Sequence, residues 1–489
     1  MNPTDLDTIT LCPERIELKK FLANKEHGLE KKEYNAILKS LRERYKLAFH
    51  NYFAEMHPYL RFEIGEEKVF WNYKEDEGIY EEVTSTTVQE WILKLMIAES
   101  LQDAATTSFA KNVAARYRAC YEERGNTYDS FDDQREWFHC KNGWIHTHTL
   151  EFAPHAPERL SRRVSAVAYD KEATCPVYDT FLDEQLQIPK DQVRVIDQFS
   201  GLLLTPDITK QKMLVIIGKP GCGKSTLLDA WSDVLGDLST EKKLSEISND
   251  AMIRFSGGDL VDKTLCWFDE VNVTRSEMGN QLNTLITGQT IRVERKGING
   301  ISKPQNTTKS ILTANSLPRS AEIGIYRRML LIYFNYSFTD NLTDNQDVRE
   351  ILRKEAPGIL NRMLIGLKDL TKQKNFTVME GHDELIEEYK TESNTVAEFL
   401  DEYFEYDEKA PKLESKILLD TYKNFSGDKY SQGLTPQRFG VMISQNGLMK
   451  FSKIQISRGS KGKRMWAGLR LRDTYEINNF GLIVGKDEY

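Results

Sequence analysis

Residues 218–225 have the residue types and spacing that bind a nucleoside polyphosphate. They read GKPGCGKS, the pattern of a phosphate-binding loop, in which glycines aim backbone N–H groups at phosphate oxygens. Lys224 adds a positive charge for the β- and γ-phosphates, and the Ser225 hydroxyl is a ligand for Mg²⁺. The expected nucleotide contacts are Gly218, Lys219, Pro220, Gly221, Cys222, Gly223, Lys224, Ser225 and Thr226.

The segments on either side of this loop must hold it in place. Residues 213–217 are all apolar and predict a buried strand. Residues 225–235 predict a helix, and the N-terminus of a helix favours anions. A strand before and a helix after are the context that separates a true phosphate loop from a chance match. The sequence therefore predicts a nucleotide-binding α/β domain that uses ATP and Mg²⁺.

Two carboxylates follow the next buried-looking run. Residues 264–270 read TLCWFDE, which predicts a short strand that ends at Asp269 and Glu270. In phosphate-loop proteins a neighbouring strand delivers an Asp to the Mg²⁺ shell, so Asp269 is the second expected metal ligand beside Ser225. Glu270 is expected to orient and deprotonate a water. This pair favours hydrolysis of the γ-phosphate over transfer to a substrate hydroxyl.

Polar side chains also follow a third apolar run, at residues 310–315. This run predicts a strand that ends on Asn315. In an open parallel sheet the carboxyl ends of the strands border the ligand crevice, so Asn315 is expected to contact the γ-phosphate or the attacking water. Arg327 and Arg328 come twelve residues later. An arginine that acts across a subunit boundary neutralises transition-state charge, which predicts an assembly of several copies.

The order of these motifs resembles that of the superfamily III helicases, and more narrowly of the phage/plasmid and poxvirus primase–helicase family. The resemblance also rests on the blocks at residues 287–296, 313–319 and 324–328. It identifies Lys224, Ser225 and Thr226 with the first family motif, Asp269 and Glu270 with the second, and Asn315 with the sensor. It further implies a DNA-gripping hairpin at Lys296, with Arg292 and Arg295 beside it. Arg327 or Arg328 matches the arginine finger.

One departure from the family pattern is visible. After Thr287 and Gly288 the family has Gly-Asp, whereas this chain has Gln289 and Thr290. The turn geometry of this block is therefore open, but its basic character is retained.

The resemblance implies an α/β fold: a phosphate-loop, AAA+-like motor with a parallel sheet, an α+β N-terminal region and a C-terminal winged helix. The expected parts are a helical segment at 1–57, an α+β region at 58–190 and the ATPase core at 191–340. A helical lid or linker at 341–392 and a winged-helix DNA-binding domain at 393–489 follow. Residue patterns predict helices at 14–57, a small β-meander at 60–83 and helix again at 87–125. The family's primase domain has no counterpart in this sequence.

Composition limits the remaining possibilities. The chain has 489 residues and a net charge of −8, so nucleic-acid contacts must be local basic patches. Six scattered cysteines favour a reducing compartment. No apolar run is long enough to span a membrane, and the first residues lack a signal pattern. We expect a soluble protein of the host-cell cytoplasm with no membrane partner.

The last part of the chain contains such a patch. Residues 450–472 carry eight basic residues and no acidic one. Two strands are predicted there, at 451–456 and 465–471, joined by a basic turn at 458–464, and a helix is predicted to open at Thr435. Helix and hairpin together favour a DNA-contacting winged helix, in which the tip grips phosphates. The expected DNA contacts are Arg458, Lys461, Lys463 and Arg464.

Two other clusters are weaker candidates. His139, Cys140, His146, His148 and His155 lack the paired spacing of a zinc site. Asp129, Asp132 and Asp133 lie in a loop-like stretch, which disfavours polymerase metal carboxylates.

The function that these features predict is an ATP-driven DNA helicase that replicates a phage, plasmid or other mobile element. It would work as a homo-oligomeric, hexameric ring on single-stranded and forked DNA, and a separate primase or other replication proteins are expected partners. The first alternative is an origin-binding initiator, whose ATPase drives assembly or local melting. The second is a nucleotide-driven protein remodeller, which would not respond to DNA.

Overall fold

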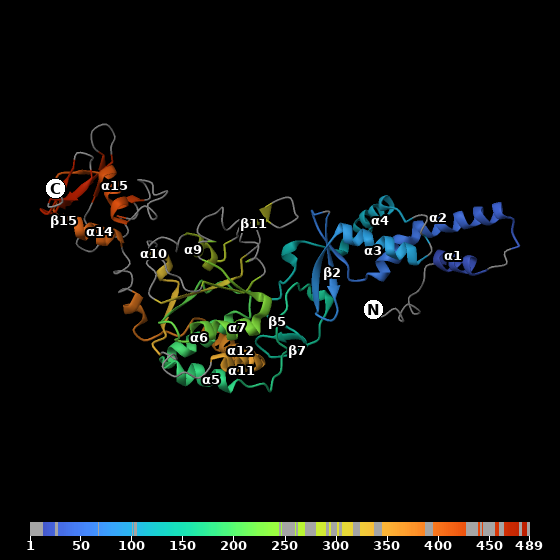
Figure 1. Ribbon diagram of the computed structural model, residues 1–489, viewed down its shortest axis with the longest axis horizontal. Coiled ribbons are helices and arrows are strands. Elements are labelled where there is room, and N and C mark those ends of the chain that lie inside the picture. The colour runs from blue at the N-terminus through green and yellow to red at the C-terminus, as the bar shows by residue number, and fades with distance from the viewer. Residues whose placement is uncertain are drawn as a thin grey trace.

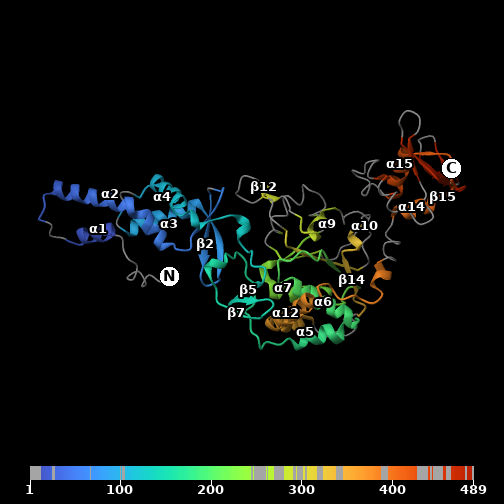
Figure 2. The ribbon, with the colours of Figure 1, turned by 180° about the vertical axis from the view of Figure 1, so that it is seen from behind.

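The computed structural model describes residues 13–24, 28–66, 68–99, 101, 105–243, 246, 260, 263–268, 280–289, 293–294, 301–302, 306–315, 323–336, 345–386, 395–426, 439–440, 443, 455–458, 464–478 and 482–486. Helices and a small sheet form the N-terminal part, a parallel sheet the centre, and a smaller unit the C-terminal part (Figures 1 and 2). Within the described ranges, no helix has the length and apolar character needed to cross a membrane.

The described N-terminal part combines four helices with a four-stranded sheet. The helices are α1 (Pro13–Ala23), α2 (Lys31–Met56), α3 (Ser85–Ala98) and α4 (Thr107–Cys120). The sheet has the order β3-β2-β1-β4, with β1 (Arg61–Glu63), β2 (Val69–Lys74), β3 (Ile79–Thr84) and β4 (Gly125–Asn126). β1, β2 and β3 pair antiparallel in succession, which confirms the predicted meander. The predicted helical stretch 87–125 contains two helices, whose N-termini are capped by the Thr84 and Thr106 hydroxyls.

A buried ion pair joins helix α1 to the residue that follows helix α3. Arg15 on α1 donates two hydrogen bonds of 2.5 Å to the carboxylate of Glu99, just past α3. Both side chains are 6% exposed, and the Tyr52 hydroxyl donates to the same carboxylate at 3.1 Å. Burial alone would raise the pKa of Glu99, but the hydrogen bonds and charge of Arg15, with Lys19 and Tyr52, hold that pKa below its usual range.

Arg15→Ala is expected to lower the free energy of unfolding by about 3–5 kcal/mol, because it leaves a buried carboxylate uncompensated. Since the pKa of Glu99 is depressed in the folded state, the pair's contribution is complete above the unfolded-state pKa of a glutamate. It is lost as the pH falls through the folded-state pKa. Urea unfolding of both proteins from neutral to acidic pH measures this loss.

The control for this experiment is Arg44→Ala. Arg44 pairs with Glu17 at 2.8 Å, but the two side chains are 53% and 48% exposed, so its loss should cost less than about 1 kcal/mol. Equal destabilisation by the two substitutions would contradict the role given to burial.

A three-stranded antiparallel sheet connects the N-terminal part to the centre. It consists of β5 (Trp137–Cys140), β6 (Gly143–His146) and β7 (Phe152–Ala153). Phe138, Cys140 and Ile145 on one face join the central hydrophobic core. The other face carries aromatic rings, because Trp137 pairs with His146 and His139 with Trp144. Short 3₁₀ turns flank this sheet at Glu122–Arg124, Tyr128–Ser130 and Pro157–Arg159.

The centre is a five-stranded, all-parallel sheet with the order β14-β8-β13-β10-β9. The strands are β8 (Met213–Ile217), β9 (Ser239–Glu241), β10 (Leu265–Phe268), β13 (Lys309–Ala314) and β14 (Met329–Tyr333). Alternate residues of β8 serve two cores: Leu214 and Ile216 belong to one, and Met213, Val215 and Ile217 to the other. Apolar residues throughout are what a strand buried on both faces requires.

Helices cover both faces of this sheet (Figure 1). The first core includes residues of α5 (Pro176–Thr180), the π-helical turn Phe181–Gln185, α6 (Lys190–Leu202), α7 (Lys224–Leu235), the 3₁₀ turn Gly236–Leu238, α11 (Asn345–Lys354) and α12 (Ala356–Gln373). The second core includes residues of α9 (Asn280–Ile286) and α10 (Ile323–Tyr326).

Helix α12 lies in the segment predicted as a lid or linker, yet it is part of the central core. It packs directly on α6, and glycines make this approach possible. A Cβ at Gly366 would lie 2.0 Å from the carbonyl oxygen of Asp197, and one at Gly201 would lie 2.2 Å from the backbone nitrogen of Leu367. Arg362 on α12 also pairs with Asp179, Asp183 and Asp197 at 2.7–2.8 Å.

The C-terminal part has its own core around Phe399, Phe404 and Trp466. Its helices are α14 (Thr395–Tyr403) and α15 (Ser415–Ser426). Its strands are β15 (Phe404–Tyr406), β16 (Leu413–Glu414), β17 (Gln455–Arg458), β18 (Arg464–Ala467), β19 (Leu469–Leu471), β20 (Tyr475–Ile477) and β21 (Ile483–Gly485).

The hairpin predicted in this part differs from the structure in one respect. The second predicted strand, 465–471, is divided at Gly468, whose φ of +89° breaks the extended conformation. β18 then pairs with β17 and β16, whereas β19 pairs with β15. Residues 451–454 of the first predicted strand, and the helix start predicted at Thr435, lie outside the described residues.

Candidate nucleotide site and nucleic-acid contacts

The predicted phosphate-binding loop joins the carboxyl end of β8 to the start of α7. Its turns depend on glycine, because Gly221 and Gly223 have φ values of +77° and +96°. Gly218 is needed for space: a Cβ there would lie 2.5 Å from both the Cys222 sulfur and the Phe334 carbonyl oxygen. The predicted strand, loop and helix are therefore all present, and the loop backbone is closely packed against β14's end.

Lys224 points back into this loop. It is 6% exposed, and its ammonium donates to the carbonyl oxygens of Gly218 at 2.6 Å and Lys219 at 3.2 Å. It also donates to Asn315 Oδ1 at 3.2 Å. All three acceptors are uncharged oxygens. The anionic oxygens of a phosphate would therefore compete well for this ammonium, since charge-assisted hydrogen bonds are the stronger kind.

The sheet brings several predicted site residues to one edge. Asn315 directly follows β13, whose last residue, Ala314, pairs with Ile217 at the end of β8. Ser225 is exposed at the start of α7 and Thr226 is half-buried. Strand β10 ends at Phe268, but the two carboxylates predicted to follow it, Asp269 and Glu270, lie outside the described residues.

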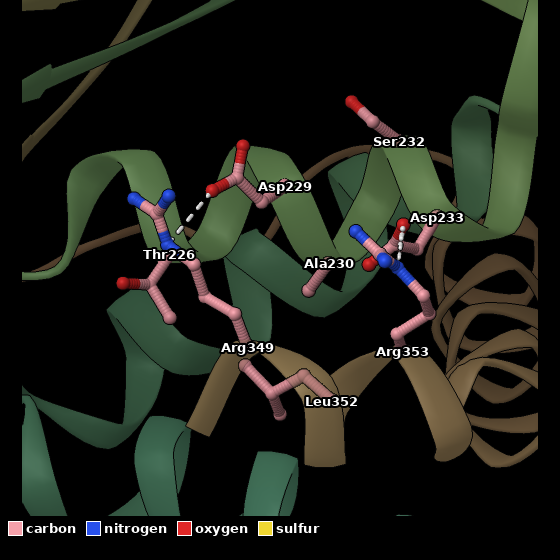
Figure 3. Close-up of a pocket in the computed structure, with 8 residues that line it drawn as sticks. All are labelled: Thr226, Asp229, Ala230, Ser232, Asp233, Arg349, Leu352 and Arg353. Atoms are coloured by element: carbon pink, nitrogen blue, oxygen red, sulfur yellow. Dashed lines mark hydrogen bonds and ion pairs between the residues drawn. The ribbon is translucent and has the colours of Figure 1, made fainter. Parts of the chain in front are cut away.

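A cleft of about 210 Å³ lies beside the loop, between α7 and α11 (Figure 3). Two ion pairs span it: Arg349 Nε lies 3.3 Å from Asp229, and Arg353 Nε lies 3.2 Å from Asp233. Thr226 also lines the cleft, so the cleft begins next to the loop. Sequence reasoning missed these four charged residues. Their i, i+4 spacing on two helices, Asp-x-x-x-Asp and Arg-x-x-x-Arg, was the available signal.

Arg327 and Arg328 lie at the opposite edge of the sheet. They precede β14, whose first residue, Met329, pairs with Met213 at the start of β8. The phosphate loop leaves the other end of β8, about 13 Å away at the usual rise per strand residue. Arg327 is exposed and Arg328 half-buried. Burial, and then the charge of Arg327, lower the pKa of Arg328.

Lys212 supports this arginine pair, and sequence reasoning did not find it. Its ammonium donates to the Arg327 carbonyl oxygen at 2.7 Å. Burial lowers the pKa of Lys212, and the charge of Arg328 acts in the same direction, while Asp383 opposes them. A lysine just before the β8 strand was visible in the sequence, but its pairing with a residue 115 positions away was not.

The predicted DNA contacts are only partly described. Strand β11 (Val293–Glu294) lies in the block 287–296, which contains Arg292, Arg295 and Lys296, and pairs antiparallel with β12 (Ile301–Ser302) just after this block (Figures 1 and 2). These three residues, and Lys461 and Lys463, lie outside the described residues. Arg458 and Arg464 occupy paired backbone positions of β17 and β18.

Two other basic residues of that patch are neutralised within the chain. Arg470 pairs with Glu405, and Arg472 Nη1 lies 3.2 Å from the same carboxylate. The basic stripe at 450–472 is therefore less positive than its composition suggests.

The histidine and aspartate clusters have structural partners. His139 bonds to the Arg163 carbonyl oxygen at 2.8 Å and to His155 at 3.0 Å, and burial lowers its pKa to about 4. Asp132 pairs with Arg162 at 2.9 Å and with Arg163 at 3.3 Å. Across the described part of the chain, no three His, Cys, Asp or Glu side chains are grouped so as to hold a metal ion.

Two families match the chain by sequence. Residues 19–187 match the family described as "D5 N terminal like", and residues 216–328 match a family of unknown function, DUF5906. The first match covers the N-terminal part and the connecting sheet, and the second covers the loop, Asn315 and the arginine pair. The chain is similar to the phage primase–helicase family. This similarity points to a helicase-like replication protein. No curated protein matches the chain.

Solved structures of one protein align with 84% of this chain at low identity. The A-form apo structure of the NrS-1 C-terminal region aligns with a TM-score of 0.46 and 12% identity, covering 84% of this chain and 96% of that one. Another apo structure of the NrS-1 C-terminal region, residues 305–718, aligns with a TM-score of 0.49, 14% identity and the same coverage.

Proposed function

We propose that this chain is an ATP-dependent DNA helicase for replication of a phage, plasmid or other mobile element. The observation that carries the proposal is the geometry at the carboxyl edge of the sheet. There the phosphate loop, Lys224 and Asn315 meet at hydrogen-bond distance. The all-parallel sheet with this loop after β8 supports the AAA+-like motor.

The residues at this edge fit ATP and Mg²⁺. The turns at Gly221 and Gly223, with φ values of +77° and +96°, let the loop aim backbone N–H groups at a phosphate. The exposed Ser225 hydroxyl and Asp269 would hold Mg²⁺, which neutralises charge on the phosphates when bound. Lys224 would bind the β- and γ-phosphates, Glu270 would accept the proton of the attacking water, and Asn315 would orient that water.

The site is proposed to be completed by a second copy of the chain. Arg327 lies at the amino edge of the sheet, remote from its own phosphate loop, and is exposed. This placement supports an arginine that reaches the nucleotide of a neighbouring subunit in a hexameric ring. Lys296 with Arg292 and Arg295 would then line a central channel for one DNA strand.

The test is the ATPase rate with and without single-stranded DNA, measured over a range of protein concentrations alongside particle size by light scattering. We expect DNA to stimulate hydrolysis, and the rate per chain to fall when dilution separates the copies. Lys224→Ala is the control for contaminating ATPases, because it removes the charge that binds the phosphates. A rate indifferent to both DNA and dilution would favour a protein remodeller or a different enzyme.

The C-terminal part keeps the origin-binding initiator as a second candidate. Arg458 opposite Arg464 in a hairpin of this part favours a DNA contact outside the motor, and we propose a winged helix here. A sequence-specific footprint that disappears on deletion of residues 395–489, without unwinding of forked DNA by the full chain, would favour the initiator over the helicase.

A further inference from the structure

A second cavity lies where the connecting sheet meets the amino ends of β10 and β13. Its lining includes Trp137, Trp144, Ser161 and Arg163 from the connecting sheet and the segment after it, and Thr205 and Thr264 from the central part. Its volume is about 60 Å³, several times the roughly 15 Å³ that a single water requires. The cavity is therefore large enough for a small polyatomic group. None of the residues predicted to hydrolyse ATP or to bind DNA lines this cavity.

Two buried hydrogen-bond donors of this lining have no acceptor among the described residues. Trp144 is 2% exposed, and its indole Nε1 is buried without a hydrogen-bond partner. Arg163 Nη1 is likewise buried and without a partner, although its Nε lies 3.3 Å from Asp132. Buried donors that lack acceptors are costly and uncommon in native proteins. Two in one cavity indicate a ligand that offers acceptor oxygens.

The charges around the cavity favour an anion. Asp132 is shared between Arg162 and Arg163, so one carboxylate faces two guanidinium groups. Lys309, which is 1% exposed, donates to the carbonyl oxygen of Thr205, and Asp207 is its attracting carboxylate. Lys309 does not line the cavity, and burial lowers its pKa to about 7, so it adds little to this charge. At Asp132, which lines the cavity, two guanidinium groups face one carboxylate, an arrangement that a bound anion would balance.

We propose that this cavity binds a phosphate group, with one oxygen accepting from Trp144 Nε1 and another from Arg163 Nη1. Two sources carry this chemistry: a phosphodiester of single-stranded DNA and free inorganic phosphate. The half-buried Trp137 lines the same cavity, with the Arg159 guanidinium 4.0 Å from its ring centre. Aromatic and guanidinium surfaces of this kind contact bases in single-strand-binding proteins. The site is separate from the phosphate loop and its proposal does not depend on ATP hydrolysis.

The test uses the full chain and two probes, inorganic phosphate and a single-stranded oligodeoxynucleotide. Affinities are measured by calorimetry in a Lys224→Ala background, so that the phosphate loop contributes little. Trp144→Phe removes only the indole N–H, and Arg163→Lys keeps the charge but removes the forked donor. We expect each to weaken phosphate binding roughly tenfold, the usual scale of a hydrogen bond to a charged group.

The matched control is Trp71→Phe. Trp71 is 3% exposed and its Nε1 is also buried without a partner among the described residues, but Trp71 lies outside the cavity. The affinities of the Trp71→Phe protein for phosphate and for the oligodeoxynucleotide should therefore be unchanged. A parallel loss for both probes identifies the DNA backbone as the source, whereas a loss for phosphate alone identifies the free ion. The proposal is overturned if neither probe binds more weakly to Trp144→Phe and Arg163→Lys than to the parent. It is equally overturned if Trp71→Phe matches them.

Failure of this cavity proposal can be distinguished experimentally from failure of the proposed helicase function. Trp144→Phe in the otherwise natural chain should retain its DNA-independent ATPase rate, because the cavity does not include the phosphate loop. A chain that binds phosphate here but hydrolyses no ATP would refute the helicase and leave the cavity proposal standing.

Discussion

Arg327→Ala is expected to lower the rate of ATP hydrolysis by about 10³-fold or more, the range seen when an arginine finger is lost. Nucleotide affinity should change less, because the residues proposed to bind ATP belong to the loop that follows β8, at the other end of the strands. Arg328→Ala should have a smaller effect on the rate, since Arg328 is half-buried and Arg327 exposed. Steady-state kcat and the affinity for a fluorescent ATP analogue measure the two quantities separately.

Mixing two inactive variants tests whether the arginine acts across a boundary between copies. Lys224→Ala chains retain Arg327, and Arg327→Ala chains retain an intact phosphate loop. In a mixed assembly, some boundaries join the intact loop of one chain to the intact arginine of the next. Activity in the mixture, where neither variant alone is active, is therefore expected. A mixture as inactive as its components would show that the arginine does not serve a neighbour's nucleotide.

The phosphate loop could be predicted from the sequence because its determinants are local. Five apolar residues, a glycine-rich turn and a helix follow one another without interruption, and each acts within a few residues of its neighbours. Asn315 was predictable for a similar reason, since a polar residue at the carboxyl end of a buried strand must lie near the edge of the sheet. What the sequence could not supply was the 3.2 Å contact between Asn315 and Lys224, which depends on β8 and β13 being neighbours.

The remaining features depend on contacts between distant residues. Arg470 and Arg472 belong to the basic stripe in the sequence, but both are neutralised by Glu405. This carboxylate lies 65 positions before Arg470 and 67 positions before Arg472. The segment at 341–392 is polar enough to suggest a lid, yet α12 is buried because Gly201 and Gly366 let two helices meet at backbone distance. The phosphate-sized cavity combines residues of the connecting sheet with the amino ends of two central strands. No local sequence pattern predicts such contacts between residues that are far apart in the chain.

Asn315→Ala is expected to lower kcat by about 10²–10³-fold with little change in KM, the scale of losing one preorganised hydrogen-bond donor at a transition state. The Asn315 Oδ1 atom accepts from the Lys224 ammonium. Its Nδ2 group is then directed away from that ammonium and is available to the γ-phosphate or the attacking water. Since the bond to water or phosphate strengthens as charge develops, its loss should affect turnover more than binding. Steady-state kinetics over a range of ATP concentrations separate the two parameters.

Asn315→Asp is expected to change KM as well as kcat, and this difference from Asn315→Ala identifies the role of the amide. A carboxylate at this position would pair with the Lys224 ammonium and repel the phosphates, so KM should rise together with the fall in kcat. Asn361→Ala is the matched control, because Asn361 on α12 donates to the carbonyl oxygens of Asp170 and Ala173 and not to the residues of the phosphate loop. Its loss should affect stability while leaving both kinetic parameters near their original values. An Asn315→Ala protein with unchanged kcat and a raised KM would show that the amide serves to bind ATP, and the sensor role would then be wrong.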